Sequence, residues 1–286
     1  MIFMLINDAD IPVRKACFGL GMSKSGYYKR QLLEPPPDLN FDVRNAIQGI
    51  ALEFPYYGYR RITREMHRHG RQVNHKRVLR IMREDNLLCI RKKFRLTTTD
   101  SNHNLPVFPN LARDIAVTGL NQLWVADITY IQLEREFIYL AVIIDIFSRK
   151  CIGWELGRDL DAVLASNALK MAISERKSLG FGGLVHHSDQ GVQYASHEYV
   201  NLLGEHCIGI SMSRRGNPYD NAFAESFMKT LKAEEVYMNE YRTFEEAYAN
   251  IKKFIEEVYN KKRLHSSIGY VPPSEFEAGI LNVCEA

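Results

Sequence analysis

Cysteine is scarce in this chain, and no two cysteines stand close together. The 286 residues contain five cysteines, none of which belongs to a C-x-x-C pair. A zinc ribbon needs such pairs and a small disulfide-linked fold needs a denser framework, so both classes are excluded. The scattered thiols are typical of a protein of the reducing cytoplasm.

Long hydrophobic runs are also missing. The longest apolar stretch, FIYLAVIIDIF at residues 137–147, is about half as long as a membrane-spanning helix and contains Asp145. The opening MIFMLI is apolar for only six residues and lacks a basic flank. We therefore predict no signal peptide, no transmembrane helix and no membrane partner.

Charge is distributed unevenly along the chain. Residues 1–120 carry 20 basic and 11 acidic side chains, a balance of +9, whereas the remainder carries 17 and 23, a balance of −6. Residues 56–95 alone hold 13 basic against 3 acidic side chains. This asymmetry predicts a polyanion-binding front half, and a merely basic linker region is the alternative.

The front half has two helical pairs. Residues 11–33 predict two short helices around a glycine turn, with Ser23 capping the second. A second pair runs from about Arg60 to His69 and, after Gly70, from beyond Asn74. Helix, turn and basic helix is the arrangement that enters a DNA major groove, although a basic helix alone is often just soluble. The candidate DNA contacts are Arg60, Arg61, Lys76, Arg77, Arg80, Arg83, Arg91, Lys92 and Lys93.

After a polar, proline-containing linker the pattern changes to strands and helices. The pattern predicts three consecutive strands, at LWVADITYI, FIYLAVIIDIF and CIGWEL. It also predicts two later strands that alternate with helices, at GLVHHSD and IGISMS. This order describes an α/β layer with a mixed sheet. The last segment reads mostly as one long helix, capped by Thr243 with Glu246 and followed by a basic KKRLHSS tail.

Three carboxylates stand out in this half. Asp127 interrupts an apolar strand, Asp189 closes a later strand, and Glu225 lies 36 positions further on, in a helix whose other face is apolar. Taken singly, they fit a strand-end residue, a turn residue and a solvated helix residue, and Asp145 is a rival that spacing does not exclude. If the two strands are neighbours and the helix crosses their ends, the three carboxylates converge.

Converging carboxylates predict a divalent-metal site, because each negative charge disfavours the others unless a cation is present. Mg²⁺ or Mn²⁺ is the expected occupant, and two such ions support in-line phosphoryl displacement. Lys229 and Lys232 return to the Glu225 face of the helix at about 100° per residue, where they are candidate DNA contacts. Glu234 and Glu235, at the end of the same helix, read as solvated charge.

The ordered blocks resemble the second-reading-frame transposases of the insertion sequence three family. The resemblance runs from about Tyr56 to Phe276 and rests on WVADITYI, YLAVIIDIFSRKCIGW, HHSDQGVQY, SMSRRGNPYDNAFAESFMKTLKAE and FIEEVYNKKRLHSSIGYVPPSEFE. It implies a ribonuclease H-like core, shared with retroviral integrases, in which Asp127, Asp189 and Glu225 are catalytic and metal-binding. It also implies that Lys232 contacts terminal DNA and that Asp145 falls outside the triad.

The resemblance sets the expected organisation and partners. We predict an N-terminal helical segment at 1–38, a basic helix-turn-helix domain at 39–96, a linker at 97–119, the catalytic core at 120–235 and a helical C-terminal segment at 236–286. The expected partners are terminal inverted repeats, target DNA and further copies of the chain on DNA. An upstream-frame protein or fusion is also expected, because the sequence contains no leucine-heptad region. We expect a cytoplasmic, nucleoid-associated protein. Unlike many integrases, the sequence contains no His-His-Cys-Cys zinc module.

Three functions follow from these features. The first is end cleavage to a 3′-hydroxyl followed by strand transfer, without a covalent enzyme intermediate, as the resemblance implies. The second is a nuclease with the same core and no strand transfer. The third, of a different class, is a DNA-binding regulator of transposition that lacks its own catalysis.

Overall fold

The structure is a computed structural model that describes residues 12–19, 21, 23–31, 40–88, 106–214 and 221–284. The chain divides into two units, Met1–Gly49 and Ile50–Ala286. In the first unit, helices α2 (Val13–Gly19) and α3 (Lys24–Gln31) confirm the predicted N-terminal pair. The Ser23 hydroxyl accepts a hydrogen bond from the Gly26 amide at 3.1 Å, as a helix cap does.

Helix α4 (Phe41–Glu53) runs across the boundary of the two units, in a stretch for which the sequence predicted no element. Beyond it, α5 (Tyr59–Arg68) and α6 (His75–Glu84) match the second predicted pair. Gly70 takes a φ of +75° in the turn between them, a conformation in which only glycine is unstrained. The Asn74 side chain caps α6 by accepting from the Lys76 amide at 2.8 Å.

The second unit contains the predicted mixed sheet. Its five strands are β1 (Leu123–Gln132), β2 (Phe137–Asp145), β3 (Cys151–Gly157), β4 (Val185–Ser188) and β5 (Gly209–Met212). They stand in the order β3-β2-β1-β4-β5. The first three are antiparallel neighbours, whereas β4 and β5 continue in parallel from β1. The change from antiparallel to parallel pairing therefore falls at β1, which carries Asp127.

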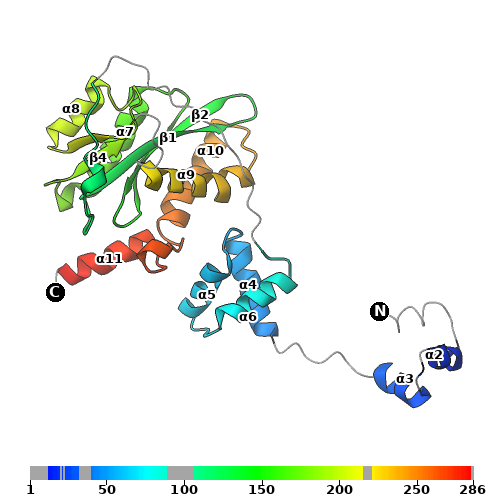
Figure 1. The fold of residues 1–286 in the computed structure, drawn as a ribbon. Helices are drawn as coiled ribbons and strands as arrows, with labels where there is room; N and C mark the ends of the chain where they lie inside the picture. The colour runs from blue at the N-terminus through cyan, green and yellow to red at the C-terminus, as the bar shows by residue number, and fades with distance from the viewer. Residues whose placement is uncertain are drawn as a thin grey trace. The chain divides into compact units, whose positions relative to one another are not determined.

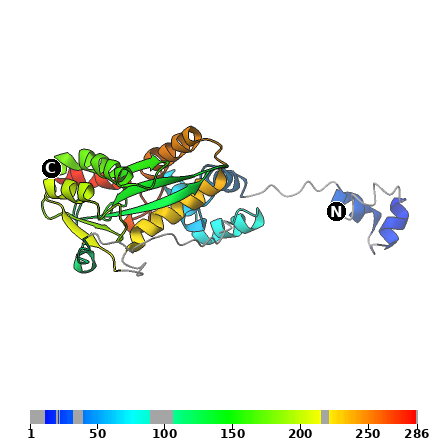
Figure 2. The ribbon, with the colours of Figure 1, turned by 90° about the horizontal axis from the view of Figure 1, so that it is seen from above.

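Helices cover both faces of this sheet, and Figures 1 and 2 show the two layers. Helices α7 (Ala162–Arg176) and α8 (His197–Glu205) pack on one face, which includes Trp124 and Ala126. Helices α9 (Ala222–Glu234) and α10 (Phe244–Lys253) pack on the other, which includes Leu123 and Val125. The alternation along β1 is the period of two expected of a strand buried on both faces.

The C-terminal segment contains one helix beyond the long helix that the sequence predicted. After α10 the helix continues as a wide π turn over Phe254–Tyr259, and a separate helix, α11 (Pro273–Cys284), follows. The long helix capped at Thr243 is therefore present, and helix α11 is the element that the sequence did not predict. Pro272 and Pro273 look like breakers, whereas a proline in the first turn of a helix loses no hydrogen bond. Arg176 of α7 forms a buried ion pair with Glu277 of α11, and this pair fastens α11 to the sheet layer.

The predicted cap of α10 is present. The Thr243 hydroxyl accepts from the Glu246 amide at 3.2 Å, and the Glu246 carboxylate accepts from the Arg242 amide at 3.0 Å. Over the described residues, no helix has the length and apolar character needed to cross a membrane. The apolar run at 137–147 supplies strand β2 instead.

Candidate active site

Two of the predicted carboxylates lie on neighbouring parallel strands. β1 pairs with β4 so that Val125 stands opposite His187. Asp127 is two residues beyond Val125, and Asp189 is two residues beyond His187, so both reach the same level of the sheet. Because alternate residues of a strand point to opposite faces, Asp127 shares the face of Val125, which lies in the core beneath α9.

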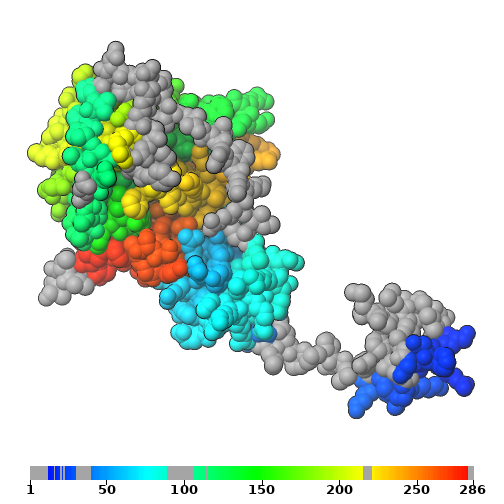
Figure 3. Space-filling view, viewed as in Figure 1, coloured from blue at the N-terminus to red at the C-terminus, as the bar shows by residue number. Residues whose placement is uncertain are grey.

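The start of α9 is held directly beside Asp127. Asn221 precedes the helix, and its side-chain amide donates to the carbonyl oxygen of Ala126 at 3.0 Å. Glu225 lies in the first turn of α9, which forms part of the molecular surface (Figure 3). The helix therefore brings the third carboxylate to the same edge of the sheet as the two aspartates.

Electrostatics show that the three carboxylates sense one another. The pKa of Asp127 is raised to about 7, mainly by burial and also by the nearby charges of Asp189 and Glu225. The Ile128 amide, which donates to Asp127 at 3.0 Å, and the ammonium group of Lys232 act in the opposite direction. Burial is the main cause of the raised value, and the contributions of Asp189 and Glu225 show that both carboxylates lie close enough to act on Asp127.

The two lysines of α9 have different surroundings. Lys232 is half-buried, with its ammonium nitrogen 4.6 Å from the centroid of the Tyr130 ring on β1. Burial lowers the pKa of Lys232, and the Asp127 charge opposes that effect. Lys229 has a side chain that is 79% exposed, and its ammonium nitrogen lies 3.3 Å from a carboxylate oxygen of Glu225. Lys232 is thus the cation positioned near the half-buried Asp127 carboxylate.

The donor set suits a hard divalent cation in its chemistry. Carboxylate oxygens are the ligands that Mg²⁺ and Mn²⁺ prefer. In the described part of the chain, no group of three or more His, Cys, Asp and Glu side chains is arranged to hold a metal ion as it stands. The Glu225 carboxylate faces Lys229, and release of such an exposed ion pair costs at most about 1 kcal/mol.

Asp145, the rival carboxylate, has a structural role. Its side chain is 1% exposed and accepts hydrogen bonds from the backbone amides of Asn121, Phe147 and Ser148 at 2.9 to 3.2 Å. These bonds fasten the turn after β2 to the beginning of β1. Asp145, on β2, stands opposite Trp124 of β1 in the antiparallel register. Trp124 lies three residues before Asp127, so the two aspartates are at different levels of the sheet.

The interpretation of Glu234 and Glu235 as solvated charge was wrong. Both oxygens of Glu234 accept from the buried Arg263 guanidinium at 2.7 Å. Glu235 accepts from the Tyr241 hydroxyl and the Asn239 amide at 2.8 Å. The end of α9 is therefore bound to Arg263, 29 positions away, through Glu234 and to the segment that directly follows the helix through Glu235.

The candidate DNA contacts of the front half divide into two groups. Arg60, Lys76, Arg77, Arg80 and Arg83 are exposed on α5 and α6. Arg61 is half-buried, and its guanidinium carbon lies 5.5 Å from the centroid of the Tyr57 ring. Arg91, Lys92 and Lys93 lie outside the described residues.

Two further residues belong to the site although the sequence did not single them out. Asn221 ties α9 to β1, as described above. Tyr194 is fully buried, and the charges of Asp127 and Asp189 are among the causes that raise the pKa of its hydroxyl, after burial itself. Within the described ranges, that hydroxyl has no hydrogen-bond partner. Asn221 lies in the block DNAF and Tyr194 in the block GVQY. Nothing in the residue types of these short blocks distinguishes a site residue from an ordinary turn residue, so the sequence did not reveal either role.

Comparison with known proteins agrees with this architecture. Residues 118–218 and 206–273 match the integrase core domain family, and residues 39–95 match the HTH-like domain family. The transposase InsF of insertion sequence IS3A from Escherichia coli K12 is 32% identical over 282 residues, which cover 96% of this chain and 97% of the relative. The transposase of IS904 from Lactococcus lactis is 38% identical over 222 residues, covering 77% and 87%.

A third relative is the uncharacterized 31 kDa protein of insertion element IS600 from Shigella sonnei, 37% identical over 264 residues, or 91% of this chain and 96% of the relative. Among solved structures, a simian T-cell lymphotropic virus intasome in complex with a PP2A regulatory subunit aligns with a TM-score of 0.46 at 17% identity, covering 77% of this chain and 70% of that one.

The mixed sheet, the carboxylates at its edge and the integrase core matches define an enzyme of the transposase and integrase class. The chain belongs to the IS3 family of bacterial insertion-sequence transposases. The HTH-like domain and the family together make DNA its substrate.

Proposed function

We propose that this chain cuts the ends of its own insertion sequence to leave a 3′-hydroxyl and then joins that hydroxyl to target DNA. The observation that carries the proposal is the register of β1 with β4, with Asp127 and Asp189 at one level of the sheet beside the first turn of α9. Asp127, Asp189 and Glu225 are the proposed catalytic and metal-binding carboxylates.

Two divalent ions, Mg²⁺ or Mn²⁺, would when bound activate the attacking oxygen and stabilise charge on the phosphate and the leaving oxygen. The chain's own residues have complementary tasks. The carboxylates hold the ions, and Lys232 is near enough to Asp127 to meet a phosphate oxygen of the terminal DNA. Lys229, once released from Glu225, adds a second cation on the exposed face of α9.

The helical front half is proposed to bind the terminal inverted repeat. Arg60, Lys76, Arg77, Arg80 and Arg83 are exposed on a helix pair whose apolar side is buried through Ile62, Val78 and Ile81. We propose that these side chains contact phosphates, together with Arg61, Arg91, Lys92 and Lys93. Joining two ends in one reaction requires several copies of the chain on DNA, so we also propose a multimeric active form.

The test is an end-cleavage and joining assay with duplex DNA that ends in the terminal inverted repeat, run with this chain and with an upstream-frame fusion in parallel. Wild type with Mg²⁺ should give nicked and joined products, and Asp189→Asn should give neither. Asp159→Asn, at an exposed position, is the matched control and should behave like wild type. Nicking without joining would indicate a nuclease, and unchanged activity in Asp189→Asn would refute the proposed site.

A further inference from the structure

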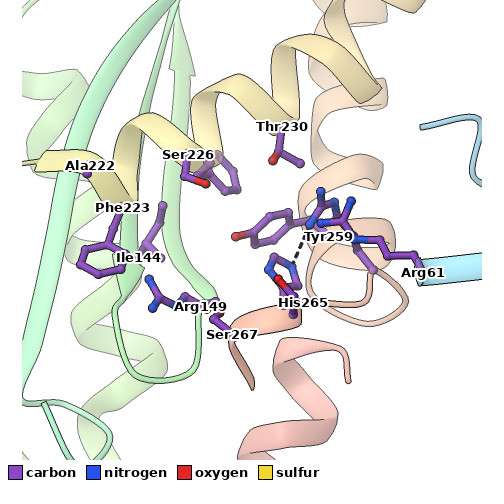
Figure 4. A pocket seen from close by; sticks show the side chains of 13 residues that line it. Arg61, Ile144, Arg149, Ala222, Phe223, Ser226, Thr230, Tyr259, His265 and Ser267 are labelled. Atoms are coloured by element: carbon purple, nitrogen blue, oxygen red, sulfur yellow. Dashed lines mark hydrogen bonds between the residues drawn. The ribbon is translucent and has the colours of Figure 1, made fainter. Parts of the chain in front are cut away.

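A pocket lies beside α9, and the three proposed catalytic carboxylates are not part of its lining. It has a volume of about 360 Å³ (Figure 4). Ser226 and Thr230 face it from α9, at about 100° and 140° around the helix from Glu225. The turn between β2 and β3, the segment after the π turn and helix α5 supply the other walls, through Arg149, Arg263 and Arg61.

The wall of this pocket is cationic. Three arginines line it and no carboxylate does. Arg263 is neutralised by Glu234, which accepts from it twice at 2.7 Å. Arg61 and Arg149 form no ion pair with any carboxylate in the described ranges, and a guanidinium stays charged at any physiological pH. The pocket therefore holds two guanidinium groups without a direct carboxylate partner among the described residues, and the charges of Glu234 and Asp145 act on them without forming an ion pair.

Arg149 is held in place by an aromatic ring while one of its guanidinium nitrogens is buried. Its guanidinium carbon lies 4.1 Å from the centroid of the Phe223 ring, a cation–π arrangement that fixes the side chain. Its Nε atom is buried and has no hydrogen-bond partner among the residues that the structure describes. Burial lowers the pKa of both Arg149 and Arg61, and the charge of Arg263 adds to the effect on Arg61. Burial of a cation without a counterion is unfavourable, so the pocket favours an anion.

The chemistry of the wall selects among anions. Guanidinium groups together with serine and threonine hydroxyls are the usual partners of phosphate oxygens in protein–DNA contacts. The cavity is larger than one phosphate needs and leaves room for an attached sugar, beside the Phe223 ring, which is 42% exposed. Phe223 and Glu225 stand on the same first turns of α9, so one strand of DNA can reach both faces of the helix.

We propose that this pocket holds a backbone phosphate of the DNA strand whose reacting phosphodiester lies at the carboxylates. The proposal rests on the proposed function, since it assumes DNA at the carboxylate edge. An α-helix is about 10 Å across and nucleotides follow one another at about 3.4 Å, so the bound phosphate lies about three or more nucleotides from the reacting one. The pocket then sets the register of the cut.

The variants are chosen to separate charge from folding. Arg149 has a φ of +65°, and asparagine tolerates this conformation, so Arg149→Asn removes the charge and keeps the turn. Arg149→Lys retains the charge. Arg61→Gln removes the second free cation. Arg158→Gln is the matched control, because Arg158 is a half-exposed arginine of the same unit that lies outside the pocket.

The measurement is binding of the full chain to a terminal-repeat duplex without divalent ions, as a function of salt, together with ethylation interference at single phosphates. Arg149→Asn and Arg61→Gln should each weaken binding about tenfold at 0.1 M salt and lower the salt slope by about 0.9. The interference pattern should lose one position, about three or more nucleotides from the cut. Arg149→Lys should keep that position, and Arg158→Gln should match wild type.

An interference pattern unchanged in both pocket variants, with melting temperatures equal to that of wild type, would overturn the proposal. So would stabilisation by deoxyadenosine monophosphate with an unchanged pattern, which would mean a site for free nucleotides. Because this binding assay needs no cleavage, a failure of the pocket leaves wild-type nicking and joining intact. A failure of the proposed function appears instead as wild type that binds ends but never cuts them.

Discussion

Replacement of Asp127 by asparagine should stabilise the metal-free protein at neutral pH. In the folded chain burial, with the charges of Asp189 and Glu225, raises the pKa of Asp127 to about 7, against 3.8 for an unperturbed aspartate. The unfolded chain therefore ionises near pH 4 and the folded chain only near pH 7. The free energy of unfolding falls as the pH rises between these values, and the loss is complete above the folded pKa.

The size of the effect follows from the shift. A difference of about three pKa units, at 1.36 kcal/mol each, corresponds to about 4 kcal/mol. The side chain is half-buried by its accessible surface, so partial hydration lowers the expected gain to about 1–3 kcal/mol. Asparagine carries no charge and still accepts from the Ile128 amide. In a chain of this size the gain raises the melting temperature by on the order of 5 °C.

The assay is thermal unfolding of wild type and Asp127→Asn from pH 4 to pH 8.5 in the presence of a chelator, with Asp159→Asn as the exposed control. The gap between Asp127→Asn and wild type should be small at pH 4, widen up to about pH 7 and then stay constant. Added Mg²⁺ should narrow the gap, because it stabilises only the carboxylate that binds it. A gap independent of pH, or a variant less stable than wild type at pH 8, would refute the reasoning.

Two further predictions concern other charged groups. Arg176→Met should lower the free energy of unfolding by about 1.5–3 kcal/mol in urea denaturation, because the buried Glu277 carboxylate loses its guanidinium partner and keeps Lys150, whose ammonium nitrogen lies 3.2 Å away; a loss below about 0.5 kcal/mol would contradict this account. Lys232→Ala should slow end cleavage at least about tenfold, with a smaller effect for the exposed Lys229→Ala, since hydrogen bonds to charged groups contribute about 1.5–3 kcal/mol. Equal rates for both lysine variants in the cleavage assay would argue against a specific contact of Lys232.

Much of the fold could be predicted from local patterns. The alternation around Asp127, the run that forms β2 and the cap at Thr243 depend on neighbours within a few residues, and the structure confirms each of them. The mixed sheet followed from the order of strands and helices. Helix α11 was missed because its two leading prolines indicate an end more often than a beginning.

Parts of the site could not be predicted, because they depend on which distant segments meet. Glu234 has the sequence context of a surface residue, yet Arg263, 29 positions away, covers it. Asp145 lies in a strand as apolar as that of Asp127, and only its three backbone donors reveal a structural role. The cationic pocket likewise joins Arg61, Arg149 and Arg263 from three separate segments.

The sequence by itself determined the family, the mixed α/β core and the spacing of Asp127, Asp189 and Glu225, because these are properties of ordered local blocks. The tertiary structure decided how the charges are compensated. It placed Lys229 beside Glu225, held Lys232 near Asp127 and left Arg61 and Arg149 of the pocket without an ion pair in the part of the chain that the structure describes. The reason is physical, since the free energy of a charge depends on burial and on partners within a few ångströms, and these are defined only when the chain has folded.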